Sequence, residues 1–251
     1  MGTSVFGTPI TAAYLAKMEE YKYKTITTRD MANVAFEMKN EDGKDARARA
    51  YVDTNRVKYG NTTYISCLIY NATGDTIRLK TYCEPTALIG ANLSPSPYPM
   101  LIMNGQWGAY LVSYAGAVVY AAKNETGVEY QVVYSYGANV APSKVYTGIQ
   151  ERGHYRATDP WTTYSSALDA KNTHCYETHH VSGLSSFATM GVYASGYSYP
   201  VFEGIITLNG AWPNNSPVTP APTPCSEPRL ALLTAKTDEL AVSDEQQAKG
   251  N

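Results

Sequence analysis

The first sixty residues follow a helical pattern of hydrophobic positions. ITAAYLAKMEEY, residues 10–21, is short and periodic, and TTRDMANVAFEMKN, residues 27–40, begins at a threonine suited to capping a helix. KDARARAYVDTNRVKYG, residues 44–60, ends with Gly60 at a natural cap position. These segments predict three modest amphipathic helices. In the third, the apolar side is expected to consist of Ala46, Ala50, Tyr51 and Val57.

From about Thr62 the hydrophobic period changes to two. YISCLIY and TIRLKTY flank the turn NATGD and predict a β-hairpin. In the first of these strands Cys67 shares a face with Ile65 and Ile69 while Ser66 faces the other way, so we expect Cys67 to be a small core residue. WGAYLVSY, AGAVVYAAK, VEYQVVYSY and KVYTGI continue the pattern. Short strands joined by turns predict a β-sandwich or barrel, because an α/β sheet would need crossover helices.

One helix interrupts the strands. Asp159 is expected to cap it, with Pro160 at its first position and Trp161, Tyr164 and Leu168 on one face. HCYETHHV, SFATMGVY and SYPVFEGIITL follow as further strands. Both faces of the last one are apolar, which is typical of a central strand. The fold class that we predict is mainly β: a two-sheet sandwich with an N-terminal helical segment and one helix before the last strands.

The hydrophobic pattern also divides the chain. We predict a helical segment at 1–60 that packs on a sandwich at 61–212, followed by a proline-rich linker at 213–224 with five prolines. Residues 225–251 are expected to form a polar and weakly amphipathic tail, because an isolated helix of this length is marginal.

Composition narrows the classes of function. A formal net charge of −2 means that the chain lacks the excess of positive charge with which proteins bind nucleic acid. No apolar stretch reaches the roughly 18 to 20 residues that span a bilayer, and the N-terminus lacks the pattern of a secretory signal, so we expect a cytoplasmic chain with reduced cysteines. The 22 tyrosines leave two interpretations open: a surface that contacts sugars, headgroups or proteins, or rings that fit half-buried strands.

Three stretches carry a resemblance to a known family. VFGTPIT, YGNTTYISCLIYNATGDTI and SPYPMLIMNGQWGAYLVS resemble the small jasmonate-induced proteins of plants over roughly residues 5 to 209. The motifs NGQWGA and IYNATGDT are moderately specific, because each joins a turn to strands in a fixed order. The resemblance implies a stress or defence protein without a known catalytic activity.

A more distant resemblance is to actinoporins and fungal fruit-body lectins, whose two-sheet sandwich has a similar order of strands. In actinoporins a serine after the VVYSY-like strand and aromatic residues on the following helix form a phosphocholine pocket. The resemblance therefore implies a ligand site here, although Ser165, Ser166 and Gly137 depart from the residues that those proteins carry. The ligand-binding residues that we predict are Ser135, Tyr136, Trp161, Tyr164 and Trp107.

HCYETHH, residues 174–180, is the one cluster of potential metal ligands. On a strand it divides into Cys175, Glu177 and His179 on one face and His174, Tyr176, Thr178 and His180 on the other. Cys175 and His179 would then lie roughly 13 Å apart, too far for a thiolate–imidazolium pair. Structural or surface histidines are favoured. A metal site formed by His174, Cys175, His179 and His180 stays open if another strand adds ligands.

Three functional hypotheses remain. The favoured one is a non-enzymatic stress protein that binds a glycan, a phospholipid headgroup or a protein through a tyrosine-rich surface, with no cofactor. The alternatives are an enzyme or metal-binding protein that uses HCYETHH, and a structural protein that forms homo-oligomers through its tail. The sequence contains none of the common catalytic motifs, such as G-x-S-x-G, the P-loop or H-E-x-x-H.

Overall fold

Two β-sheets face each other in the structure, a computed structural model that describes residues 4–58, 64–83, 98–113, 115–138, 143–169, 173–194 and 198–211. Sheet A has the strand order β1-β5-β2-β11-β10-β9, and sheet B has the order β4-β3-β6-β7-β8. Sheet A consists of β1 (Val5–Phe6), β5 (Trp107–Ser113), β2 (Tyr64–Ala72), β11 (Ser198–Leu208), β10 (Leu184–Ala194) and β9 (His174–His179). Sheet B consists of β4 (Leu101–Ile102), β3 (Ile77–Cys83), β6 (Ala115–Lys123), β7 (Glu129–Gly137) and β8 (Lys144–Glu151).

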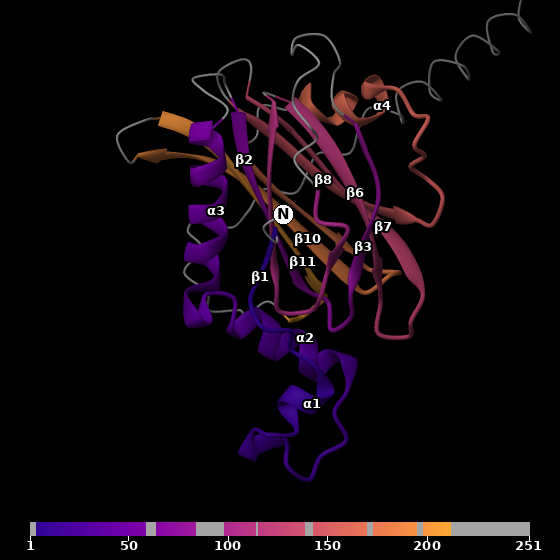
Figure 1. The fold of residues 1–251 in the computed structure, drawn as a ribbon. Coiled ribbons are helices and arrows are strands. Elements are labelled where there is room, and N and C mark those ends of the chain that lie inside the picture. The colour runs from indigo at the N-terminus through magenta and orange to yellow at the C-terminus, as the bar shows by residue number, and fades with distance from the viewer. Residues whose placement is uncertain are drawn as a thin grey trace, which may run out of the picture.

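Helices cover the sandwich at three places (Figure 1). α3 runs along the outer face of sheet A beside β1 and β2, α1 and α2 form one end of the molecule, and α4 lies at the opposite end. The α-helices are α1 (Ala12–Leu15), α2 (Thr28–Glu37), α3 (Lys44–Lys58) and α4 (Trp161–Ser165), with 3₁₀ turns η1 (Glu19–Tyr21), η2 (Glu41–Gly43) and η3 (Ser166–Asp169). The expected mainly-β, two-sheet fold with N-terminal helices and one later helix is confirmed. The expected linker at 213–224 and tail at 225–251 lie outside the described residues.

The core between the sheets follows the alternation of the strands. Cys67 is fully buried there, as expected, beside Ile65 and Ile69. β11 is a central strand between β2 and β10, and it is parallel to β2. Its residues Phe202, Ile206 and Leu208 point between the sheets while Val201 and Ile205 point to the helices, which explains why both of its faces are apolar.

Several tyrosines are fully buried, although the composition suggested either a binding surface or half-buried strands. The interior contains five rings that are less than 2% exposed, namely Tyr70, Tyr110, Tyr120, Tyr134 and Tyr136. Each hydroxyl is satisfied inside the protein; for example, Tyr120 donates to the carbonyl of Pro99 at 3.0 Å and Tyr70 donates to the carbonyl of Ala35 at 2.5 Å. Tyrosine therefore fills the core here, since a buried phenol is tolerated where its hydroxyl has a partner.

The N-terminal helices match the predicted order but differ in detail. α2 is capped by Thr27 in a capping box with Asp30, as the sequence indicates. α1 is much shorter than residues 10–21, because Met18 is extended and a 3₁₀ turn follows it. In α3 the predicted apolar side is wrong at Ala46 and Ala50, which are exposed, while Ala48 and Val52 are buried instead. Tyr51 is partly buried against Phe6, as predicted. Because the alanines at 46, 48 and 50 lie on different sides of the helix, its sequence has little amphipathic character, and contact with the sheet determines which side is buried.

The later helix also begins differently from the prediction. α4 starts at Trp161 with Pro160 as its N-cap residue, and Asp159 does not cap it. The Asp159 carboxylate instead accepts a hydrogen bond at 2.7 Å from the backbone N–H of Arg156. The Asp159 carboxylate is therefore used in a local turn and not in capping α4, an alternative that short polar side chains often adopt.

The two turn motifs NATGD and NGQW join the sandwich to the N-terminal helices. The Asn104 side chain donates to the carbonyls of Ile10 (2.9 Å) and Met31 (3.0 Å) and accepts from the N–H of Gly74 (2.9 Å). Gly74 has φ +81°, and a Cβ there would lie 2.2 Å from the carbonyl oxygen of Thr28. Trp107 donates its indole N–H to the carbonyl of Lys39 at 3.0 Å. The motifs therefore dock residues 10–39 onto the sheets.

Lys44 is buried at the same junction. It is only 4% exposed, and its Nζ donates to the hydroxyl of Tyr70 (3.1 Å) and the carbonyl of Gly105 (3.0 Å). Burial lowers the pKa of Lys44 to about 8, although Asp42, Glu41 and Asp45 act in the opposite direction.

This lysine predicts a rise in stability with pH. Because the pKa of Lys44 is about 8 in the folded state and near 10.5 in the unfolded state, the unfolded state binds more protons between these values. We expect the free energy of unfolding to rise from pH 8 to pH 10 relative to the Lys44→Met variant, measured by urea unfolding at each pH. Parallel curves for the two proteins would show that burial does not lower the pKa of Lys44 in the folded state.

No helix in the described part of the chain is both long enough and apolar enough to cross a membrane.

Candidate functional site

A cluster of aromatic side chains covers the outer face of sheet B where α4 packs. We call it the α4 surface and define it by Tyr146, Tyr155, Trp161 and Tyr164, which lie over Ala117, Val119 and Val133. The strand register explains the arrangement. Each residue of one row lies opposite the next on the neighbouring strand, so the side chains share this face; the row runs across β3, β6, β7 and β8 through Cys83, Ala117, Ser135 and Tyr146. Trp161 and Tyr146 are partly exposed, whereas Tyr164 and Tyr155 are buried.

The Tyr146 ring lies over the strand that carries it. A Cβ built on Gly148 would come within 2.5 Å of the Tyr146 hydroxyl, so only glycine leaves space for this ring beside the sheet. Sequence reasoning missed Tyr146 as a site residue. The alternation of KVYTGI does carry the signal, since Val145 and Ile149 point into the core and Tyr146 points the other way.

Backbone hydrogen bonds fix the rest of the aromatic cluster. The Gln131 amide accepts from the N–H of Tyr155 (2.7 Å) and donates to the carbonyl of the same residue (3.1 Å). Tyr155 and Tyr164 stack with ring centroids 5.6 Å apart, and the Tyr164 hydroxyl donates to the carbonyl of Arg156 at 3.0 Å. Burial, with a smaller contribution from Asp159, raises the pKa of Tyr164 to about 12, so this phenol stays neutral at physiological pH.

Ser135 is the polar residue within this apolar face. It is fully buried, and its Oγ has no hydrogen-bond partner among the described residues. Its neighbours in register are Ala117 and Tyr146. A buried hydroxyl without a partner costs about 1–3 kcal/mol. The row therefore holds an unsatisfied donor and acceptor next to partly exposed aromatic rings.

Two of the predicted ligand-binding residues lie elsewhere. Tyr136 points between the sheets, where it is fully buried with its Oη 3.4 Å from that of Tyr110. Trp107 is 1% exposed and packs with Tyr70 beneath the N-terminal helices. The prediction is wrong for these two residues, because neighbouring positions on a strand point to opposite faces and Trp107 belongs to the other sheet. Ser135, Trp161 and Tyr164 are brought to one face.

The heptapeptide HCYETHH forms β9, as the alternation predicts, with His180 just beyond the strand. His174 lies 3.4 Å from the hydroxyl of Thr173, and His180 is exposed. His179 packs against the Tyr130 ring at 5.7 Å and accepts a hydrogen bond from the N–H of Ser182 at 3.2 Å. These imidazoles have separate structural surroundings.

Cys175 points into the core and is 2% exposed. The expectation that all cysteines are reduced is wrong for this residue, which is disulfide-bonded. Its sulfur therefore offers no thiolate to a metal. Within the part of the chain that the structure describes, no group of three or more His, Cys, Asp or Glu side chains could hold a metal ion. His174, Cys175, His179 and His180 do not converge.

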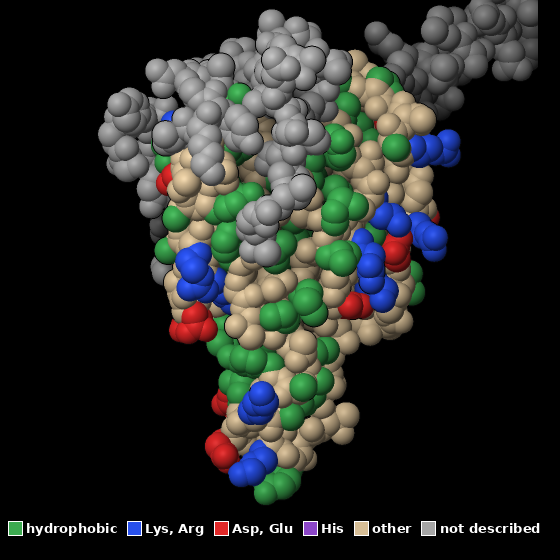
Figure 2. Space-filling model, in the orientation of Figure 1, with side chains coloured by type: hydrophobic (Ala, Val, Ile, Leu, Met, Phe, Trp, Pro, Cys, Tyr) green, Lys and Arg blue, Asp and Glu red, His purple; other side chains and the backbone are tan. Residues whose placement is uncertain are grey.

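Charges of both signs are mixed on the surface. Figure 2 shows basic and acidic side chains together on the projecting N-terminal end and on the side that carries β3. Ion pairs account for several of them, including Lys80 with Glu129 (3.4 Å) and Lys123 with Asp75 (3.1 Å). The face in this view has no broad field of one sign.

Comparison with known proteins places the chain in a family. The family model described as "Nakanori-like protein" matches residues 6–205, which include the N-terminal helices, the α4 surface and both sheets except for Val5 of β1 and the end of β11. The chain belongs to the Nakanori-like family. The "23 kDa jasmonate-induced protein" of barley (Hordeum vulgare) is 35% identical over 213 residues, covering 81% of this chain and 99% of the barley protein.

Two solved structures resemble this chain to different degrees. The crystal structure of the lipid binding protein Nakanori matches with a TM-score of 0.64 and 23% identity, covering 81% of this chain and 99% of Nakanori, which supports the fold. The lectin of Xerocomus chrysenteron matches with a TM-score of only 0.34 and 6% identity, over 58% of this chain and 100% of the lectin. The expected relationship to jasmonate-induced proteins is confirmed.

Proposed function

We propose that this Nakanori-like protein is a stress-related binding protein whose α4 surface holds the headgroup of a membrane lipid. The single observation that carries the proposal is the buried Ser135 hydroxyl, which has no partner among the described residues and lies beside Tyr146 on an aromatic face. The relationship to Nakanori, whose structure is described as that of a lipid binding protein, and to a jasmonate-induced protein supports the proposal.

The chemistry of the α4 surface suits a choline headgroup. The partly exposed rings of Trp161 and Tyr146 can hold a quaternary ammonium against their faces, an interaction of about 0.5–2 kcal/mol per ring. The Ser135 hydroxyl can donate to a phosphate oxygen, which would satisfy it. Tyr164 and Tyr155 hold the neighbouring surface rigid through their stacking and backbone hydrogen bonds.

Vesicle binding tests the proposal. The full chain is mixed with vesicles of phosphatidylcholine, phosphatidylethanolamine or phosphatidylserine, and bound protein is measured by flotation. We expect preference for phosphatidylcholine, and a loss of affinity of about tenfold in Trp161→Ala, since one cation–π contact and its buried area are removed. Ser135→Ala is expected to weaken binding about tenfold or less without lowering the melting temperature, because its hydroxyl makes no internal hydrogen bond.

Tyr23→Ala supplies the matched control. Tyr23 is an aromatic residue that is 92% exposed, in the segment between η1 and α2, and this helical end of the molecule lies opposite α4 in Figure 1. Its binding should equal that of the unmodified chain. Equal losses in Tyr23→Ala and Trp161→Ala, or no preference among the three lipids, would disprove the proposed site.

A further inference from the structure

An apolar strip lies along the edge of sheet B that β3 and β4 form. Seven large apolar side chains are exposed in the described part of the chain, and three of them lie singly in separate turns or connections. The other four are Tyr82, Met100, Leu101 and Met103, each between 40% and 65% exposed. The Tyr82 ring stacks on that of Tyr98 with centroids 4.4 Å apart, which joins β3 to the segment 98–103. We call these four residues the β4 edge.

The segment 98–103 holds the β4 edge firmly, because it contacts both sheets. β4 pairs with β3 of sheet B, where Leu101 lies opposite Arg78. A Cβ at Gly108, in β5 of sheet A, would come within 2.5 Å of the Ile102 side chain and 2.9 Å of Pro99, so both side chains pack closely on β5. Ile102 is fully buried in the core. The exposed side chains of the segment therefore project from a well-anchored backbone.

Arg78 places a cation beside the apolar strip. It is exposed, and it has no ion pair or hydrogen bond among the residues that the structure describes. The carboxylates of Asp75 and Glu129 pair instead with Lys123 (3.1 Å) and Lys80 (3.4 Å). An unpaired guanidinium next to exposed apolar side chains complements the phosphate group of a phospholipid, which lies just outside the acyl chains.

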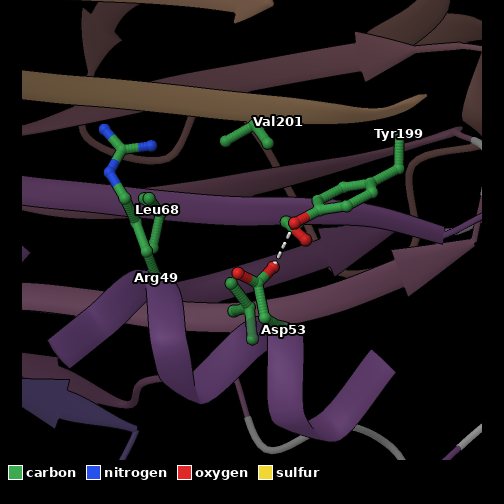
Figure 3. Close-up of a pocket in the computed structure, with 7 residues that line it drawn as sticks. Arg49, Asp53, Leu68, Tyr199 and Val201 are labelled. Carbon is green, nitrogen blue, oxygen red and sulfur yellow. Dashed lines mark hydrogen bonds between the residues drawn. The ribbon is translucent and has the colours of Figure 1, made fainter. Parts of the chain in front are cut away.

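The outer face of sheet A offers no comparable surface, because α3 covers it. Figure 3 shows this contact, in which Tyr199 of β11 donates its hydroxyl to Asp53 of α3 at 2.6 Å. Arg49 of α3 also forms an ion pair with Glu203 of β11. The polar groups between α3 and the sheet thus satisfy one another.

The size of the β4 edge favours a lipid bilayer over a protein as its partner. A stable protein complex buries about 800 Å² on each partner, far more than four partly exposed side chains supply. β4 is only two residues long, so it has too few backbone groups for another chain to add a strand. Binding to a bilayer requires neither a large area nor a matching shape, since it depends on buried apolar area and electrostatic attraction.

We infer that the β4 edge inserts into the surface of a phospholipid bilayer, with Met100 and Leu101 among the outer acyl chains and Arg78 at the level of the phosphates. The inference rests on the proposed function, because it adds a second membrane contact to the headgroup site. Tyr82 connects the two regions, since the next residue, Cys83, belongs to the row at the α4 surface. Two contacts on one folded domain reinforce each other even where each is weak.

Flotation with phosphatidylcholine vesicles tests the insertion. Met100→Gln and Leu101→Gln in the full chain should each weaken binding about fivefold, because a polar side chain replaces an apolar one that enters the acyl region. Both side chains are exposed, so the melting temperature should not change. Val181→Gln is the matched control: Val181 is 82% exposed in the turn between β9 and β10, and its loss should leave vesicle binding unchanged.

Methionine-methyl nuclear magnetic resonance locates the inserted side chains. The full chain, with isotope-labelled methionine methyl groups, is bound to phosphatidylcholine nanodiscs that carry a nitroxide on the acyl chain. The signals of Met100 and Met103 should broaden, while that of Met190, which is 5% exposed in β10, should stay sharp. Met100→Gln assigns the Met100 signal.

The variants separate this inference from the proposed function. If Trp161→Ala weakens vesicle binding but Met100→Gln and Leu101→Gln do not, the insertion is overturned and the headgroup site stands. If the two edge variants weaken binding but Trp161→Ala does not, the insertion stands and the headgroup site fails. No vesicle binding at all overturns both. The insertion is also overturned if the Met100 signal stays sharp, or if Leu101→Gln lowers the mass in solution, which would identify a second copy of the chain as the partner.

Discussion

The protein should unfold abruptly when the pH rises above about 10. Five fully buried tyrosines, namely Tyr70, Tyr110, Tyr120, Tyr134 and Tyr136, have pKa values that burial raises well above the usual range. Their phenols ionise near pH 10 only in the unfolded state, so the stability that is present below pH 10 is lost as the pH rises further. Five such groups remove about 7 kcal/mol per pH unit, against a typical total stability of about 5–15 kcal/mol.

Tyrosinate absorbance and circular dichroism, recorded on the same samples, measure this transition. Both signals should change together within about two pH units above pH 10. Tyr134→Phe removes one of the five groups and should make the pH dependence about one fifth less steep; Ser186, which donates to the Tyr134 hydroxyl, keeps its contact with Thr147. A gradual tyrosinate signal in a protein that keeps its near-ultraviolet dichroism would show that these phenols reach solvent in the folded state.

Asn104→Ala should be the most destabilising single substitution at the junction between the helices and the sandwich. It leaves the carbonyls of Ile10 and Met31 and the N–H of Gly74 without their side-chain partner in a site that is 4% exposed. At about 1–3 kcal/mol for each unsatisfied group, partly relieved by water, the free energy of unfolding should fall by about 3–5 kcal/mol. Guanidinium unfolding measures the loss, and proteolysis should cut the N-terminal segment first.

Asn124→Ala is the matched control for this substitution. The Asn124 side chain also accepts several hydrogen bonds, from the backbone of Thr126 and Val128 and from the Thr126 hydroxyl, but it lies in an exposed turn. Water replaces those bonds when the side chain is removed, so we expect a loss of about 1 kcal/mol or less. Similar losses in the two variants would mean that burial at Asn104 contributes nothing to the docking of the helices.

The sequence patterns located most of the strands because alternation is a local property. The face of Cys67, the central position of β11 and the division of HCYETHH across a strand all follow from a period of two, and the structure agrees with each of them. The capping box of α2 could be found in the same way, since Thr27 and Asp30 are three residues apart. These features require no knowledge of which element packs on which.

Positions that depend on a partner element were harder to predict. The prediction of the buried face of α3 was wrong at Ala46 and Ala50. Alanines at positions 46, 48 and 50 point in different directions around the helix, so the sequence does not indicate which of them packs on the sheet. Trp107 and Tyr136 were grouped with Trp161 because aromatic residues near one another in a pattern can still lie on different faces or sheets. Alternation along KVYTGI indicates which face Tyr146 occupies, but only the docking of α4 shows that this face carries the aromatic cluster.

The sequence by itself determined the fold class, the order of the helices and strands, and the turn motifs that mark the family, because propensity, alternation and capping act over a few residues. Only the tertiary structure decided which residues could form a site. It buried Tyr110, Tyr120, Tyr134 and Tyr136 between the sheets and separated the side chains of HCYETHH. It also left the Ser135 hydroxyl without a hydrogen-bond partner among the described residues. The physical reason is that burial and hydrogen-bond satisfaction depend on residues far apart in the chain, which strand register and helix docking bring together.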